Sequence, residues 1–288
     1  MHVQSIANTQ DILGETPVWC ADEQALYWVD VRRPAVHRCD TRTAKVATWA
    51  MPELVGSLAL CVNGDVLVAL RSSVRRFNPA TEKLELVTAP ESGNPQMRLN
   101  DGRVDRRGRF WVGSMNDVTR GPEGTLYRLD GSGGCVPMLG EIFVPNSLAW
   151  SPDSRTMYFA GPDLRTVFAY DFEPESGTMS NRRVFAEYAA PAFPDGATVD
   201  ADGYLWCAAY EGWRITRYAP DGRIDRVIEV PVQCPTAVTF GGSDMTTLFV
   251  TTARQRIAEE ALAKQPLAGA VLALDVGIAG IAEPRFIG

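Results

Sequence analysis

A unit of short β-type runs recurs along this chain at a nearly constant spacing. Each run is rich in aromatic and β-branched residues and follows a turn rich in Gly, Asp or Asn. A period of about 40 to 50 residues with four short strands per unit is typical of a propeller blade. The repeat therefore predicts an all-β fold, a six-bladed β-propeller with four antiparallel strands per blade. The residues at the middle of the runs lie 40 to 48 positions apart: Tyr27, Leu67, Trp111, Tyr158, Trp206 and Phe249.

The six units account for nearly all 288 residues, so we expect residues 1–288 to form a single propeller domain. Length alone would favour two domains, and a β-sandwich would not explain six regular units. A circular fold must pair its ends, so we expect a strand near residues 3–6 to close the ring against the last blade. Residues 257–264 (IAEEALAK) are typical of a short helix inserted in a loop.

Composition excludes several function classes. The net charge is −7, from 28 Lys and Arg against 35 Asp and Glu, which favours neither nucleic acid nor an anionic membrane as a partner. The chain has no apolar run long enough to span a bilayer and no secretory signal pattern, so we expect a cytoplasmic protein. Its six cysteines are scattered and form no Cys-x-x-Cys pair, which predicts buried free thiols.

The two histidines restrict the chemistry further. With only His2 and His37, and no Gly-x-Ser-x-Gly segment, a serine-histidine triad is disfavoured. Histidine-based metal motifs and phosphate-binding glycine loops are also absent from the sequence. Any metal ion would therefore be held mostly by oxygen ligands.

One phase of the repeat is unusual. In a propeller the innermost strand of every blade starts at the same mouth of the central channel, so residues 11 or 12 positions before each anchor should surround that mouth. Glu15, Asn146 and Asp195 would supply two carboxylates and an amide oxygen, a set that suits Ca²⁺, Mg²⁺ or Mn²⁺, and Asn100 could add a fourth ligand directly or through water. Zinc more often takes His or Cys. The residues at this phase are Glu15, Gly56, Asn100, Asn146, Asp195 and Ala237.

Each of these residues also has a purely structural interpretation. Asn100 and Asp195 begin Asn-Asp-Gly and Asp-Gly segments that are common in turns, and Glu15 alone could be an ordinary loop acid. Four oxygen-bearing side chains at one phase are hard to obtain by accident, which favours a site. Arg98 shares a strand face with Asn100 by alternation and could bind an oxygen-rich substrate or simply lie on the surface.

Loop residues offer weaker candidates. Glu123, Tyr210 and Trp213 lie in predicted loops that could overhang the channel mouth. Nothing in their spacing assigns them a role beyond possible lining of the site.

Several segments resemble the regucalcin/gluconolactonase (senescence marker protein) family, in order and over nearly the whole chain. Two positions depart from its pattern: Thr16 and Ser147 stand where that family usually has Gly. The matching segments are 14–19 (GETPVW), 98–102 (RLNDG), 146–153 (NSLAWSPD), 180–185 (SNRRVF), 194–196 (PDG), 240–242 (FGG) and 252–254 (TAR).

The resemblance implies a propeller that holds one divalent cation through Glu15, Asn146 and Asp195. Arg98 and Asn100 match the family's substrate-contacting positions, and family members hydrolyse sugar lactones to aldonic acids. It favours Ca²⁺ as the cation and leaves Mg²⁺, Mn²⁺, Zn²⁺ or Fe²⁺ open. The implied partner is a small sugar lactone, and we expect a monomer or a weak homo-oligomer.

These observations give one hypothesis and three alternatives. The hypothesis is divalent-metal-dependent hydrolysis of an aldonolactone, with the metal polarising the carbonyl and Asp195 as general base. A second enzyme interpretation is hydrolysis of another lactone, ester or phosphoester at the same metal. The others are a non-catalytic calcium-binding regulatory protein and a protein-interaction propeller, although a scaffold has no need of carboxylates around its channel.

Overall fold

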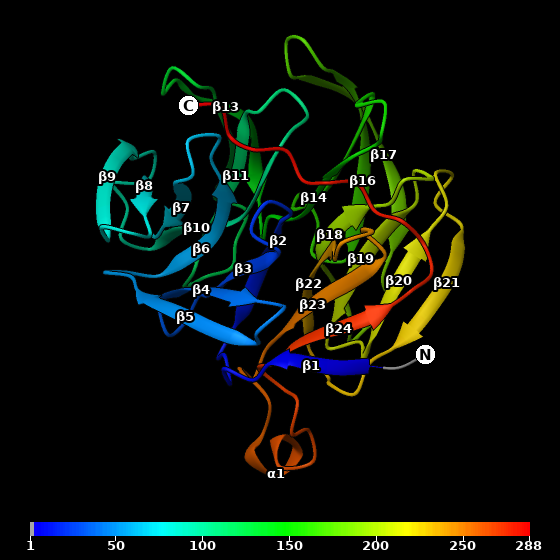
Figure 1. Cartoon of the computed structure of the whole chain (residues 1–288). Coiled ribbons are helices and arrows are strands. Elements are labelled where there is room, and N and C mark those ends of the chain that lie inside the picture. The colour runs from blue at the N-terminus through cyan, green and yellow to red at the C-terminus, as the bar shows by residue number, and fades with distance from the viewer. Residues whose placement is uncertain (1–2) are drawn as a thin grey trace.

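The structure, a computed structural model, describes residues 3–288, so His2 lies outside the described residues. The chain forms six four-stranded antiparallel sheets arranged around a central axis (Figure 1). This arrangement confirms the predicted six-bladed, nearly all-β propeller. The inner strands of neighbouring blades, such as β2 and β6 or β14 and β18, pack against one another around the channel.

Each blade runs from an inner strand at the channel to an outer strand at the rim. The first three blades are β2 (Gly14–Cys20), β3 (Ala25–Asp30), β4 (Ala35–Asp40), β5 (Lys45–Ala50); β6 (Val55–Leu60), β7 (Val66–Leu70), β8 (Val74–Asn78), β9 (Lys83–Thr88); and β10 (Met97–Val104), β11 (Phe110–Asn116), β12 (Gly124–Leu129), β13 (Cys135–Ile142). The last three are β14 (Asn146–Trp150), β15 (Thr156–Ala160), β16 (Thr166–Glu173), β17 (Thr178–Glu187); β18 (Phe193–Val199), β19 (Leu205–Tyr210), β20 (Arg214–Tyr218), β21 (Ile224–Glu229); and β22 (Pro235–Gly241), β23 (Thr247–Thr252), β24 (Val271–Asp275) with β1 (Val3–Ala7).

The sixth blade is closed by the start of the chain. β1 pairs antiparallel with β24, with Val3 opposite Leu274, so the sheet order is β1-β24-β23-β22. This confirms the expected closing strand. The predicted helix is also present but shorter, because α1 spans only Glu259–Leu262, on the connection between β23 and β24.

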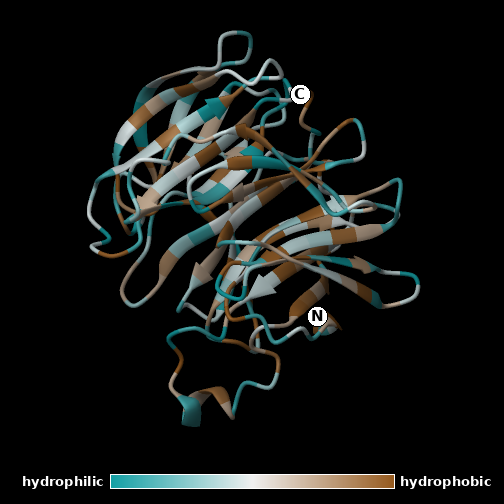
Figure 2. Ribbon diagram, turned by 90° about the vertical axis from the view of Figure 1, so that its left-hand side faces the viewer, coloured by the Kyte–Doolittle hydropathy of each residue, from teal (hydrophilic) through white to brown (hydrophobic). Residues whose placement is uncertain are grey.

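The core lies between the blades. Inner strands such as β6 are buried at every position, whereas the rim strand β5 is exposed at nearly every position, and hydrophobic positions are interspersed with hydrophilic ones along the strands (Figure 2). Three blades use the same polar contact within this core: an indole Nε1 donates to a buried aspartate near the inner strand. The bonds are Trp28–Asp11 at 2.8 Å, Trp111–Asp105 at 2.8 Å and Trp206–Asp200 at 2.7 Å.

Every inner strand has a register shift near its first residues. A bulge places two residues opposite one and re-aims the side chains beside it. The phase that the sequence singles out therefore coincides with a local break in regular pairing. The shifts lie between Glu15 and Val18, Val55 and Ser57, Leu99 and Gly102, Asn146 and Ala149, Pro194 and Ala197, and Pro235 and Ala237.

The tail of the chain crosses the other ends of the inner strands (Figure 1, red). Phe286 forms a parallel bridge with Cys61, at the end of the second blade's inner strand, and Gly280 pairs with Asp200 beyond the fifth. Glu283 accepts hydrogen bonds from Arg103 Nη1 at 2.5 Å and Thr198 Oγ1 at 3.2 Å. Residues 276–288 thus bind the propeller face opposite the bulges.

Two smaller predictions concern thiols and membranes. All six cysteines are free and five are buried, as the sequence predicts, whereas Cys135 is partly exposed. Among the helices of residues 3–288, none has the length and apolar character needed to cross a membrane.

Candidate functional site

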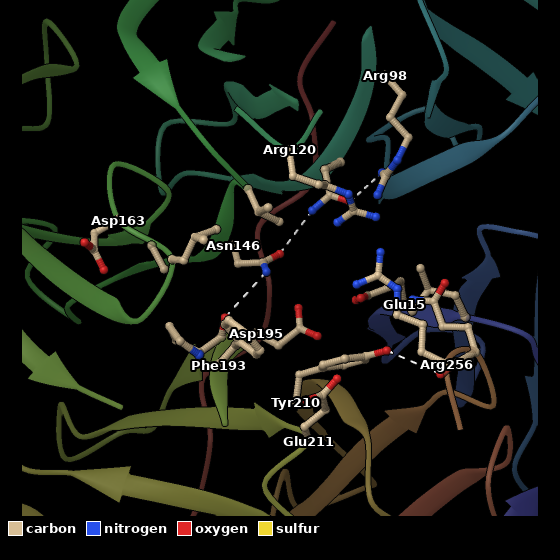
Figure 3. Close-up of a pocket in the computed structure, with 17 residues that line it drawn as sticks. Glu15, Arg98, Arg120, Asn146, Asp163, Phe193, Asp195, Tyr210, Glu211 and Arg256 are labelled. Carbon is tan, nitrogen blue, oxygen red and sulfur yellow. Dashed lines mark hydrogen bonds between the residues drawn. The ribbon is translucent and has the colours of Figure 1, made fainter. Parts of the chain in front are cut away.

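The starts of the inner strands surround a cavity of about 200 Å³. Four of the six residues at the singled-out phase line it: Glu15, Asn100, Asn146 and Asp195. They come from four different blades, and in Figure 3 Glu15, Asn146 and Asp195 project toward the same space. The remaining lining residues are Leu13, Arg98, Arg120, Val144, Ala160, Asp163, Leu164, Phe193, Pro194, Tyr210, Glu211, Gln255 and Arg256.

Gly56, which shares this phase, has a packing role. A Cβ atom at this position would clash with the backbone of Leu99 and Asn100 in the neighbouring blade. The glycine lets β6 and β10 approach closely, and the close approach fixes the backbone beside Asn100.

Three buried carboxyl groups of the channel have raised pKa values. Burial, followed by the charges of Asp195 and Asp101, raises the pKa of Glu15 well above its usual value. Burial and the charge of Asp101 raise the pKa of Asp195 in the same way. Burial likewise raises the pKa of Asp101, although Arg103 opposes it. Negative charge in this channel therefore exceeds what the protein's own cations balance.

The two asparagines are joined across blades. Asn100 Nδ2 donates to Asn146 Oδ1 at 3.1 Å and to the carbonyl of Pro145 at 2.8 Å. Asn100 Oδ1 accepts a 2.5 Å hydrogen bond from Arg98 Nη1. The amide oxygen of Asn100 is thus paired within the protein, whereas its contact with Asn146 fixes the orientation of that neighbouring amide.

Arg98 is held by a carboxylate that the sequence reasoning missed. Arg98 is only 2% exposed, and its Nε donates to Asp117 Oδ1 at 2.9 Å. Arg32 donates to both oxygens of Asp117, at 2.8 and 2.7 Å. Burial alone would raise the pKa of Asp117, but these hydrogen bonds and charges lower it below its ordinary range. No sequence signal marks Asp117; it lies beside Arg98 because β10 pairs with β11, which sets Met97 opposite Asn116.

Loops supply the rim of the cavity. Tyr210 lines it, and its hydroxyl donates to the Gln255 carbonyl at 3.5 Å. Among the described residues Trp213 and Glu123 are not part of the lining: Trp213 is 44% exposed, and Glu123 accepts hydrogen bonds from Thr119. The charged rim residues that the sequence did not indicate are Arg120, Asp163, Glu211 and Arg256.

The two departures from the family pattern have left-handed backbone. Thr16 has φ 47° and Ser147 has φ 59°, a region where glycine is the least strained residue. Both side chains are buried. Ser147 Oγ donates to the carbonyl of Asp195 at 2.5 Å, whereas the Thr16 hydroxyl reaches the Gly56 carbonyl only at 3.5 Å.

The donor set suits a divalent cation. Two carboxylates and an amide oxygen are the hard ligands that Ca²⁺, Mg²⁺ and Mn²⁺ prefer, and a cation would offset the charge that raises the pKa values of Glu15 and Asp195. Within residues 3–288 no group of three or more His, Cys, Asp or Glu side chains could hold a metal ion. A cation here would therefore need Asn146 and further oxygens from water or substrate.

Comparison with known proteins gives concordant results. Residues 13–254 match the family described as SMP-30/Gluconolactonase/LRE-like region. The chain is 36% identical, over 99% of both chains, to a 6-deoxy-6-sulfogluconolactonase of Pseudomonas putida. It is 35% identical, over 98% of this chain and 95% of the relative, to an L-arabinolactonase of Azospirillum brasilense.

The same fold occurs among solved structures. A calcium-binding protein, regucalcin, from Agrobacterium tumefaciens superposes with a TM-score of 0.95 at 26% identity, over 99% of this chain and 97% of that one. The similarity covers the whole propeller, including all six blades.

Proposed function

This chain belongs to the SMP-30/gluconolactonase/LRE-like family, and from that premise we propose that it hydrolyses a sugar lactone to the aldonic acid. Its relatives named as lactonases align over nearly their full length, which supports an enzyme acting on carboxylic ester bonds. The observation that carries the proposal is the convergence of Glu15, Asn146 and Asp195 on one cavity beside Arg98.

Lactone hydrolysis needs a base near the carbonyl carbon. Water adds to that carbon, the bond to the ring oxygen breaks, and the ring oxygen takes up a proton. We assign Asp195 as the base: its carboxylate would accept the proton of the attacking water and return it to the leaving ring oxygen. Asp195 is 5% exposed and lines the cavity, so a substrate bound there would lie against it.

Glu15, Asn146 and Asp195 would hold the divalent cation. When bound, that cation supplies Lewis-acid polarisation of the lactone carbonyl. Ca²⁺ is our first candidate, since the calcium-binding regucalcin has the same fold and the donors are all oxygens. Mg²⁺, Mn²⁺, Zn²⁺ and Fe²⁺ are the alternatives for the test below.

Arg98 would orient the substrate, and Asn100 would support it at the substrate side of the cavity. Asp117 and Asn100 fix the Arg98 guanidinium from two sides, so its remaining N–H groups are oriented before a sugar hydroxyl binds. The side chain of Asn100 mainly positions Arg98 and Asn146. Replacing Arg98 should chiefly raise KM, because this residue aligns the substrate and transfers no proton.

A pH-stat assay across aldonolactones tests the proposal, with the spontaneous rate subtracted and each divalent cation tried in turn. We expect turnover that a chelator removes and one cation restores, and that Asp195→Ala abolishes. Near-wild-type turnover by Asp195→Ala would contradict the assignment of the base. Faster turnover of aryl lactones or phosphotriesters would favour the second enzyme interpretation.

The resemblance to a calcium-binding regucalcin favours one further candidate, a calcium-binding regulatory protein without catalysis. The same assay separates the two. Calcium binding with no turnover of any lactone, ester or phosphoester would favour the regulatory protein.

A further inference from the structure

One side of the cavity has an excess of positive charge. The side chains of Arg32, Arg98 and Arg120 all lie within salt-bridge distance of a single carboxylate, Asp117, with Arg120 Nη2 the farthest at 3.6 Å. The fourth guanidinium, that of Arg256, lies on the same cavity wall (Figure 3). Three of these cations thus share one anion, and the fourth adds to the positive charge beside them.

Arg120 and Arg256 are the least compensated members of this group. Asp117 is already engaged by Arg32 through two hydrogen bonds and by Arg98 through one. Within residues 3–288 no carboxylate lies within salt-bridge distance of Arg256. Burial lowers the pKa of Arg120, and the neighbouring charge of Arg256 lowers it further. Two guanidinium groups therefore face the cavity close enough to repel one another.

The acidic residues of the cavity do not neutralise this pair. Glu15 and Asp195 lie where a cation would balance them. Asp163 lies at the left of Figure 3, away from Arg120 and Arg256. Its carboxylate accepts hydrogen bonds from Arg165 N and Thr166 Oγ1 of the same turn. Glu211 also lines the cavity, but no ion pair joins it to either arginine within residues 3–288.

Building on the lactonase function proposed above, we propose that Arg120 and Arg256 bind an anionic substituent of the substrate. The preferred lactone would then carry a phosphate, sulfonate or carboxylate group at the end remote from the reacting carbonyl. Guanidinium groups bind such oxyanions through paired, charge-assisted hydrogen bonds. A neutral sugar lactone would leave Arg256 without an anionic partner and Arg120 with only its 3.6 Å contact to the shared Asp117.

Four substrates distinguish the possible anions: D-glucono-1,5-lactone, its 6-phosphate, its 6-deoxy-6-sulfonate, and a glucaric acid monolactone. With the activating cation held fixed, we expect at least one charged lactone to exceed the neutral one about tenfold or more in kcat/KM, mainly through a lower KM. Raising the salt concentration should reduce this preference, because exposed charges are screened.

Variants connect the preference to these side chains. Arg120→Gln and Arg256→Gln should each lower the ratio of charged to neutral kcat/KM by about tenfold. Sodium sulfate should inhibit the wild type competitively and inhibit either variant less. Arg223→Gln, at an exposed turn between β20 and β21, is the matched control and should keep the wild-type ratio and the wild-type sulfate inhibition.

The two proposals fail in different ways. If no lactone is hydrolysed, charged or neutral, the lactonase function is wrong. If the neutral lactone is hydrolysed as well as every charged one, or if Arg120→Gln and Arg256→Gln leave the ratio unchanged, the lactonase function stands and the anion site is overturned.

Discussion

Ser147 Oγ donates a 2.5 Å hydrogen bond to the main-chain carbonyl of Asp195. The bond joins β14 to β18 and therefore connects the inner strands of two neighbouring blades. The Ser147 side chain is fully buried, and its backbone lies at φ 59°. A strained residue of the fourth blade thus holds the backbone of the residue that we assign as the base in the fifth.

Removing the Ser147 hydroxyl should destabilise the protein and slow turnover. In Ser147→Ala the buried Asp195 carbonyl keeps only the weak Cys207 thiol donor at 3.6 Å, which costs about 1–3 kcal/mol. Ser147→Gly loses the same bond but relieves the left-handed strain, worth about 1 kcal/mol. We therefore expect the free energy of unfolding, measured in urea, to fall in the order wild type, Ser147→Gly, Ser147→Ala. We also expect kcat to be about tenfold lower for Ser147→Ala than for the wild type. A glycine variant less stable than the alanine variant would refute this account.

The sequence was sufficient to predict the fold and the convergence of Glu15, Asn146 and Asp195 on one cavity, because both depend on the repeat. Tyr27 and Trp206 occupy the same phase, so the residues 12 and 11 positions before them, Glu15 and Asp195, come to the same end of the channel. Periodicity also predicted the closing strand β1. The bulges explain why this phase can turn its side chains into the cavity rather than into the blade interface.

The cavity wall could not be predicted in this way. Arg120, Asp163 and Arg256 lie on connections whose lengths differ from blade to blade, so no periodic phase marks them. Asp117 follows the second strand of its blade, and only the pairing of β10 with β11 shows that it lies beside Arg98. The conformation of these loops, which residue propensities do not determine, therefore decides which charges line the cavity wall.

A divalent cation should stabilise the folded protein if Glu15, Asn146 and Asp195 bind it. At 100 times its dissociation constant the cation should add about 2.7 kcal/mol to the free energy of unfolding, measurable by thermal unfolding with calcium or with chelator. Asp195→Asn should lose most of this increment. Asp221→Asn, at an exposed turn, should retain it, and an equal increment in both variants would place the cation elsewhere.

Asp117→Asn should destabilise the protein in a pH-dependent way. The substitution leaves the buried Arg98 without its carboxylate, a loss of about 3 kcal/mol at neutral pH. Because the folded pKa of Asp117 is lowered, this stabilisation is present above the ordinary Asp pKa of about 4 and is lost as the pH falls further. Urea unfolding should show a large difference in the free energy of unfolding between wild type and variant at pH 7, and a smaller difference at pH 3. A difference that grows at pH 3 would have the opposite pH dependence and would exclude the Asp117–Arg98 ion pair as the cause of the destabilisation.

The tail of the chain should stabilise the propeller without contributing to the site. Phe286 is 1% exposed and packs with Ala59, Phe110 and Leu129 between the second and third blades. Its backbone donates to the Leu60 carbonyl at 2.8 Å. Phe286→Ala should therefore cost about 3–5 kcal/mol, while the cavity lies at the opposite ends of the inner strands.

Thermal unfolding and lactone turnover below the melting transition measure the two effects separately. The control is Ile287→Ala: Ile287 is adjacent but 57% exposed, so its truncation should change stability by about 0.5 kcal/mol or less. We expect Phe286→Ala to melt well below this control and to keep the wild-type kcat. Equal melting temperatures would mean that the tail adds no stability, and a selective loss of kcat would mean that it reaches the site through the channel.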